Sequence, residues 1–466
     1  MVQSTNNRTG FAKAFLYAGL GLLSIGMIFG FTGGLQYILP GFLKEHLSFE
    51  KVRPLHVSSV VFWIIIAAMG TVLTYLQEHS KRPIRFPILL KIQFYLFVTT
   101  IVGILISYFF GVFGGREYWE FHPLFALPII IVWLLFLINF LSTIDSFKKQ
   151  PVYVWMWLTG LFFFLFTYIE SYLWLFPFFQ NDLVKDMTVQ WKSYGSMVGS
   201  WNMLVYGSSI YLMDKIAGNK KYSYSKIGFG LYFLGLFNLM FNWGHHIYTL
   251  PTSGYIKHIA YGVSMTELLL LGRIIYLWRK SLSEAKKQFH FLSYRFLIAA
   301  DVWVFLTLGL AIAMSVPAFN VFMHGTYIVV GHTMGATIGI NSMLLLAFVF
   351  DILGDTCKSS ASYRKMISIG YWTANISLLF FWLALIAAGV VKGQWQMSNP
   401  RIPFGNMMRQ LVPYLTVFVV AGFFLLVGFL MVVYQVVKSN IVCYSLAKKS
   451  QKARLAVSQT GDLQRT

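Results

Sequence analysis

Long apolar runs are the feature that most constrains what this chain can fold into. The hydrocarbon core of a bilayer is about 30 Å thick, so a helix needs roughly 20 mainly apolar residues to cross it. Because that core offers no water to backbone groups, such spans must be helices. We therefore predict an all-α integral membrane bundle, a single polytopic domain over residues 1–466 with short tails at about 1–10 and 439–466. About twelve spans are expected, at residues 11–39, 54–77, 86–112, 122–143, 151–177, 190–213, 224–250, 258–278, 290–316, 320–351, 365–391 and 410–438.

The basic residues are distributed asymmetrically along the chain. The formal net charge of +21 would by itself suit a nucleic-acid-binding protein. However, Lys and Arg cluster in alternate loops, and such loops mark the cytoplasmic side of a membrane protein. We therefore expect a bacterial-type inner membrane protein with both termini in the cytoplasm, in contact with lipid and not with nucleic acid. The basic clusters lie at residues 80–85, 146–149, 215–226, 279–287, 358–365 and 448–454.

Several histidines lie inside the predicted spans, toward their outer ends. His56 is near the outer end of the second span, and His245 and His246 close the seventh. The tenth span is expected to run inward from Val321, which puts His332 a third to half way down it. A lone histidine in a membrane is often a packed, hydrogen-bonded residue, but ionisable groups there are costly and usually functional. Several at one depth, two of them adjacent, predict a site for iron, copper or zinc.

His332 and Met334 stand two residues apart in the stretch VGHTM. Residues so spaced differ by about 200° around a helix, so their side chains point to nearly opposite sides. Two flat cofactors on either side of one helix would fit this arrangement, and haem takes axial His and Met ligands. Methionine is also a common packing residue in apolar helices. The spacing alone therefore leaves ligation by Met334 open.

Taken together, these residues resemble subunit I of the haem-copper oxidase superfamily, in particular the branch with bacterial nitric oxide reductases and cbb3-type oxidases. RPLH opens the second span, GHH closes the seventh, and HGT precedes VGH-x-M in the tenth. The resemblance implies two haem b-type groups, with His56 and Met334 on the low-spin haem and His332 on the high-spin haem. The family has histidine where Met334 stands, and a thioether ligand should raise the potential of that haem. Arg53, three residues from His56, is a candidate to neutralise the haem propionates.

The resemblance also implies a second metal beside the high-spin haem, which is copper in oxidases and non-haem iron in nitric oxide reductases. His245 and His246 match two of its ligands, but the third, a histidine in the sixth span, falls on Tyr194. A Tyr194 phenolate would have to overcome an ordinary pKa of about 10. Val198 stands where the reductases have an iron-binding glutamate. By contrast, Glu267 matches their glutamate near the metal centre, where it would relay protons.

Two functions follow from the resemblance, and the sequence leaves both open. The first is a respiratory oxidoreductase like the catalytic subunit of nitric oxide reductase, in which a low-spin haem b passes electrons to a high-spin b3-type site that binds a small gas. A membrane-anchored c-type cytochrome subunit, or another outer-face donor, would supply the electrons. Oxygen reduction is less favoured because Leu239 replaces the redox-active tyrosine of cbb3-type oxidases. The second is a catalytically silent dihaem paralogue that serves electron transfer or assembly in a larger complex.

Overall fold

The computed structural model describes residues 10–265, 290–354 and 361–463. These residues are mostly helical, and no β-strand occurs among them. Residues 254–265 are also helical. The named helices are α2 (Ala12–Ile38), α3 (Phe49–Ser80), α4 (Pro87–Phe109), η1 (Pro123–Phe125), α5 (Ala126–Thr143), α6 (Val152–Glu170), η2 (Leu173–Leu175), α7 (Pro177–Gln180), α8 (Leu183–Ala217), α9 (Lys226–Phe241), η3 (Asn242–Ile247), α12 (Phe291–Ser315), α13 (Pro317–Met323), α14 (Tyr327–Met334), η4 (Gly335–Ser342), α15 (Met343–Leu353), α16 (Ala361–Met397) and α17 (Phe404–Leu463).

Ten helical segments within the described ranges are long and apolar enough to cross a bilayer. They coincide with ten of the predicted spans and so support an all-α membrane bundle. The predicted span at 190–213 lies within α8, whose serines and charged residues lower its hydropathy. The span predicted at 258–278 extends beyond the described residues.

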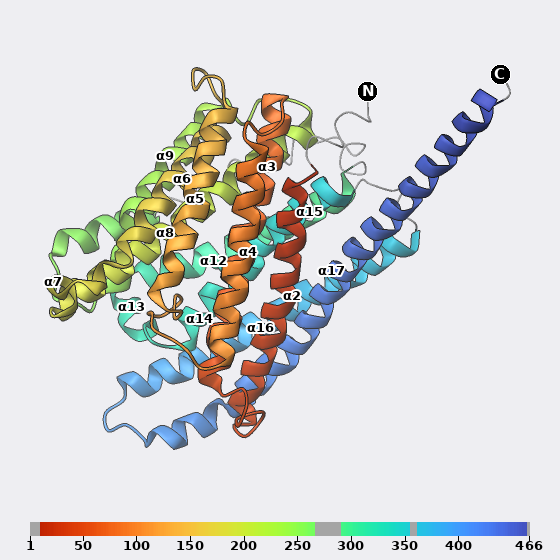
Figure 1. The fold of residues 1–466 in the computed structure, drawn as a ribbon. Coiled ribbons are helices and arrows are strands. Elements are labelled where there is room, and N and C mark those ends of the chain that lie inside the picture. The colour runs from red at the N-terminus through yellow and green to blue at the C-terminus, as the bar shows by residue number, and fades with distance from the viewer. Residues whose placement is uncertain (1–9, 266–289, 355–360, 464–466) are drawn as a thin grey trace.

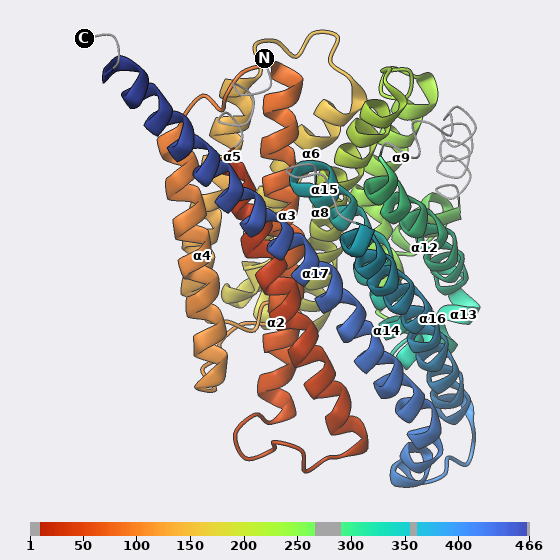
Figure 2. The ribbon, with the colours of Figure 1, turned by 90° about the vertical axis from the view of Figure 1, so that its right-hand side faces the viewer.

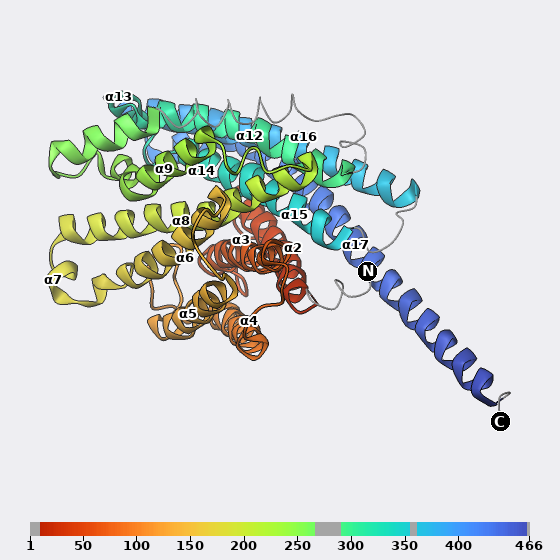
Figure 3. The same cartoon turned by 90° about the horizontal axis from the view of Figure 1, so that it is seen from above.

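Helix α3 is the central helix of the bundle. Nearly all of its side chains between Ser58 and Gln77 are buried, and it contacts α2, α4, α5, α8, α15 and η4. Seen from above, α4, α5 and α6 lie on one side of the molecule and α12, α14 and α16 on the other, with α3 and α8 between them (Figure 3). A helix that is apolar all round is expected to be buried in this way. Small residues also help, because a Cβ on Gly70 would be 2.8 Å from Phe15 of α2.

The helix that carries His332 packs very closely on α12. A Cβ on Gly335 would be 2.5 Å from Thr307 Oγ1, and a Cβ on Gly339 would be 2.5 Å from the ring of Trp303. Both glycines lie in η4, a π-helical segment that follows α14 directly. Such segments are rare and frequently occur at functional sites. The two glycines therefore fix the face that α14 and η4 turn toward α12.

The tenth span begins later than the apolar pattern predicts. Helix α13 ends at Met323, Gly325 has a left-handed φ of +71°, and the Thr326 side chain caps α14 by accepting from the backbone N–H of Ile328. His332 is thus only roughly 8 Å along the helix from Tyr327, at 1.5 Å per residue. It lies nearer that end than the predicted third to half of the span. The turn residues His324, Gly325 and Thr326 are not apolar, but a hydropathy window averages them with the apolar residues on both sides and so did not reveal the break.

Helix α17 extends well beyond the rest of the bundle (Figures 1 and 2). The segment from residue 439 that the sequence analysis treats as a tail is helical as far as Leu463. This part is rich in Lys, Ala, Leu and Gln, which have good helix propensity, and no proline follows Pro413. The intrinsic helix propensity of these residues favours the extension.

Candidate functional site

His56 and Met334 line the same cavity, which lies between α2, α3, α14, α16 and α17 and has a volume of about 230 Å³. His56 comes from α3 and Met334 from the end of α14. Much of the rest of the lining is apolar or glycine, including Gly30, Gly33 and Gly34 of α2. Segments almost 280 residues apart in sequence thus bring an imidazole and a thioether to one space.

The His56 ring is held in a defined tautomer by the backbone of α2. Its Nδ1 is 2.7 Å from the carbonyl oxygen of Gly26, and because a carbonyl only accepts, Nδ1 must donate. The lone pair then lies on Nε2, which is the arrangement typical of a histidine that binds a metal. A Cβ on Gly30 would be 2.7 Å from the imidazole. Glycine at this position is therefore needed for the ring to stay where it is.

A second cavity of about 290 Å³ is also lined by α14, together with α8, η3 and α12. Its lining includes His245 and His246 of η3 and His332 of α14, and we call it the histidine cavity. Tyr194 and Val198 of α8 line it as well. His332 and Met334 therefore face different cavities, as their spacing predicts.

The adjacent histidines of η3 are positioned by side chains that the sequence analysis missed. Their ring centroids are 4.2 Å apart. His245 Nδ1 lies 3.1 Å from Asn242 Oδ1, and the amide of Asn242 is oriented because its Nδ2 donates to Asn238 Oδ1. His246 stacks on Trp191 of α8 with centroids 4.9 Å apart and ring planes 10° apart. Asn242 stands three residues before His245, on the same helical turn, and this spacing was the available signal.

Several buried polar atoms of the histidine cavity have no hydrogen-bond partner among the described residues. They are Trp201 Nε1, Asn202 Oδ1, Thr307 Oγ1, His332 Nδ1 and Asn341 Oδ1. Buried polar groups are nearly always paired in folded proteins, so their clustering here indicates a space that takes water or a polar ligand. The cavity of His56 and Met334 has no comparable cluster among the described side chains that line it.

Arg53 lies at the start of α3, at the edge of the cavity of His56 and Met334. Its guanidinium donates to Glu120 at 3.0 Å and to Glu117 at 2.8 Å. Burial raises the pKa of the Glu120 carboxyl, and Arg53 offsets part of this rise. Arg53 is thus within reach of a group in the cavity, but it already has two acidic partners.

Among the residues that the structure describes, the ligands expected for a second metal are incomplete. Tyr194 is buried and packs edge-on against Tyr118, with ring centroids 5.9 Å apart. The described residues contain no group of three or more His, Cys, Asp or Glu side chains that could hold a metal ion. Glu267 lies outside the described residues. Two imidazoles alone do not fit an iron or copper site, which normally has at least a third protein ligand.

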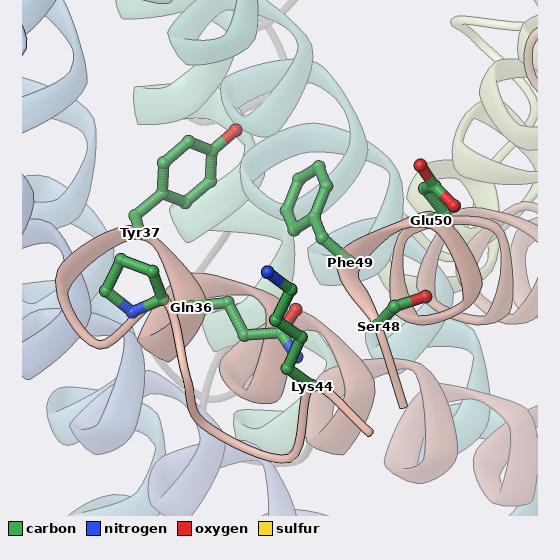
Figure 4. Close-up of a pocket in the computed structure, with 7 residues that line it drawn as sticks. Gln36, Tyr37, Lys44, Ser48, Phe49 and Glu50 are labelled. Carbon is green, nitrogen blue, oxygen red and sulfur yellow. The ribbon is translucent and has the colours of Figure 1, made fainter. Parts of the chain in front are cut away.

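A surface hollow of about 400 Å³ lies at the loop that joins α2 to α3 (Figure 4). Gln36, Lys44, Ser48 and Glu50 line it, together with Tyr37 and Phe49. The rings of Tyr37 and Phe49 pack edge to face at 5.4 Å, and both residues also line the cavity of His56 and Met334. These two rings therefore stand between that cavity and the surface.

Comparisons with known proteins give a consistent result. The family described as cytochrome c and quinol oxidase polypeptide I matches residues 10–424. A nitric oxide reductase subunit of Stutzerimonas stutzeri is 24% identical over 91% of this chain and 93% of that protein. Cytochrome c oxidase subunit 1 of Rhodobacter capsulatus is 24% identical over 88% and 80%. A haem-copper terminal oxidase dimer solved by cryo-EM has a TM-score of 0.74 at 15% identity, covering 93% of this chain and 84% of that chain, which shows a shared fold.

Proposed function

The chain belongs to the cytochrome c and quinol oxidase polypeptide I family, and from this premise we propose that it is a haem-binding subunit of a respiratory membrane oxidoreductase, resembling the catalytic subunit of nitric oxide reductase. The family implies haem and a metal site. The finer assignment to the reductase type is supported by the likeness to the nitric oxide reductase of Stutzerimonas stutzeri along nearly the whole chain. We infer a bacterial-type inner membrane location with both termini cytoplasmic, as the charge pattern predicts.

The observation that carries the proposal is the pair of cavities lined by opposite faces of α14. His56 and Met334 would hold a low-spin haem b in one, because both side chains line it and His56 Nε2 is left free to bind iron. His332 would hold a high-spin haem b in the other. Haem held there would supply an iron that changes oxidation state and could bind a small gas.

The protein's own groups would then orient the cofactors and surround the reacting gas. The Gly26 carbonyl fixes the tautomer of His56, and Arg53 would neutralise a propionate. In the histidine cavity, Asn242 and Trp191 hold His245 and His246 in place. Glu267 would deliver protons near the same cavity, and Tyr194 would be a further polar group beside it. An outer-face c-type cytochrome subunit is the electron donor that this arrangement calls for.

A second candidate function, the silent dihaem paralogue, is favoured by one specific observation. The described residues give the second metal only His245 and His246, with Val198 and Tyr194 in the places of the missing ligands. Such a protein would bind both haems without a non-haem metal and would transfer electrons or support assembly of a larger complex.

A cofactor count on the purified protein tests both candidates. Haem b is counted spectroscopically, iron and copper are counted by mass spectrometry, and nitric oxide consumption is measured with an artificial electron donor. Two haems, one further metal and gas turnover are expected for the reductase. Two haems with no further metal and no turnover would establish the silent paralogue. A colourless protein would contradict both.

A further inference from the structure

A groove of about 450 Å³ lies on the lateral surface of the bundle, where α16 and α17 run side by side (Figure 2). Trp372, Ile376 and Phe424 line it, and each of these side chains is about half exposed. Both helices are long and apolar enough to cross a bilayer. Large apolar side chains exposed on such helices contact lipid, so the groove is open to the acyl chains of the membrane.

Small side chains set between these large ones leave room for the groove. Ser368, Thr373 and Ser377 of α16 line it. The helices that form its walls are close-packed, because a Cβ on Gly428 of α17 would be 2.7 Å from the backbone nitrogen of Ala374. From Ser368 to Ser377 the groove follows α16 for roughly 14 Å. This length is close to half of the hydrocarbon core, roughly 15 Å, and so to the depth of one leaflet.

Arg295 of α12 lies at the Ser368 end of this groove. Its Nη1 donates to Ser368 Oγ at 2.9 Å, and its guanidinium carbon is 5.4 Å from the ring centroid of Trp372. The guanidinium also lies over the rings of Tyr371 and Phe291, at 4.1 and 5.6 Å. Aromatic rings attract a cation but carry no net charge. They therefore hold Arg295 beside the groove without neutralising it.

The charge of Arg295 is not paired with an acidic side chain in the part of the chain that the structure describes. Arg295 lies one turn after the start of α12, and the exposed Lys365 lies three residues before Ser368 on α16. These helix ends follow the basic segments 279–287 and 358–365, which the charge pattern places in the cytoplasm. Positive charges at that boundary attract the anionic head groups of the cytoplasmic leaflet.

We propose that Arg295 and the groove bind one anionic phospholipid of the cytoplasmic leaflet. A guanidinium has five N–H donors, of which Ser368 takes one, so others are left for the lipid phosphate. Lys365 adds a second positive charge, and an acyl chain lies along the groove against Trp372 and Ile376. Free phosphate shares the head-group chemistry, but the apolar groove beside the arginine fits a molecule that carries both a phosphate and an acyl chain. The inference is independent of the haem assignments.

The bound lipid joins α12 to α16. These two helices also meet at Trp303 of α12, whose Nε1 donates to Asn375 Oδ1 of α16 at 3.3 Å. Trp303 in turn packs on Gly339, in the π-helical segment that follows the helix of His332. A ligand that binds only the folded state stabilises it, so the anionic lipid should raise the melting temperature of the protein.

The test is lipid binding by the full-length protein in detergent, measured by native mass spectrometry. Phosphatidylglycerol and phosphatidylcholine with the same acyl chains are added in turn, and the parent should bind phosphatidylglycerol about 5-fold more tightly or better. Arg295→Gln should weaken phosphatidylglycerol binding on the order of 10-fold, because charge-assisted hydrogen bonds are lost. Lys438→Gln is the matched control, since Lys438 also lies over a ring, 5.5 Å from that of Tyr434, but does not line the groove. It should bind as the parent does.

Thr373→Phe tests the groove separately, because it fills the space for the acyl chain and leaves Arg295 in place. It should weaken the binding of both lipids, and it takes the place of Arg295→Gln if that variant does not fold. Melting temperatures separate the two sources of phosphate: phosphatidylglycerol should raise that of the parent, and inorganic phosphate should not. Equal stabilisation by inorganic phosphate would overturn the lipid assignment. Equal binding of the two lipids by the parent, or undiminished phosphatidylglycerol binding in either variant, would overturn the proposal.

Discussion

The two cavities beside α14 differ in what holds their histidines. His56 is fixed by a backbone carbonyl and enclosed by glycines and apolar side chains. His245 and His246 are fixed by the side chains of Asn242 and Trp191, in a larger space where several polar atoms have no partner among the described residues. A tight site with two ligand side chains suits a cofactor that only exchanges electrons. A wider polar site suits one that binds a small molecule and receives protons.

The largest effect is expected when the histidine proposed as axial ligand in either cavity is removed. His332→Ala should lose the haem of the histidine cavity and keep the spectrum of the other, while His56→Ala should do the reverse, because each side chain lines only one cavity. Haem content and reduced-minus-oxidised optical spectra measure this directly. Loss of both haems in either single variant, with unchanged helical content, would contradict the assignment of one histidine to each cavity.

A smaller but specific effect is expected from Met334→His. A thioether stabilises ferrous iron relative to imidazole, so the substitution should lower the potential of the low-spin haem by on the order of 0.1 V or more. The near-infrared signal of His/Met ligation should be replaced by that of two imidazoles. Thr333→Ser, which keeps the hydroxyl of the adjacent residue, is the control. An unchanged potential and near-infrared spectrum in Met334→His would mean that Met334 is a packing residue.

Gly30→Ala tests how tightly the cavity of His56 is enclosed. The new Cβ would be 2.7 Å from the imidazole, so the ring must move, at a cost of roughly 1–3 kcal/mol. We expect partial loss of the low-spin haem and a lower melting temperature, with the histidine cavity unaffected. Gly21→Ala is the matched control on the same helix, because its Cβ would have no neighbour within 4 Å. Equal haem content and equal melting temperature in the two variants would show that the imidazole can move aside without loss of haem or stability.

The candidate ligands were accessible to sequence analysis because imidazoles stand out in apolar runs and the i, i+2 spacing has a direct geometric consequence. The groups that position them were not. Gly26 acts through its backbone carbonyl, and every residue has such a group, so the sequence does not distinguish it. Trp191 is one of many aromatic residues in membrane helices. Their roles depend on which helices become neighbours.

Most helix positions also followed from hydropathy, whereas the ends depended on local backbone geometry. The tenth span starts at Tyr327 because Gly325 adopts a left-handed conformation and Thr326 caps the next helix. A hydropathy window misses both features, because it averages His324, Gly325 and Thr326 with the apolar residues on both sides. One further site feature, the π-helical segment after Met334, could not be predicted at all.

The smallest effect concerns the edge of the cavity of His56, where Arg53 pairs with Glu120. Burial raises the pKa of this carboxyl above its ordinary value, so between the two values the folded protein binds more protons than the unfolded chain. Stability from this group is therefore present at low pH and is lost as the pH rises through that window.

Glu120→Gln should remove this pH dependence, which for a single group cannot exceed about 1.4 kcal/mol per pH unit. Melting temperatures of the parent and the variant, measured at several pH values, should converge toward the acid side and show a shallower decline for the variant as the pH rises. Glu45→Gln, in the exposed loop between α2 and α3, is the control and should follow the parent. Parallel curves for the parent and Glu120→Gln would show that Arg53 fully offsets the effect of burial on the pKa of the carboxyl. The charge of Arg53 would then be neutralised by its acidic partners and would not act on a propionate.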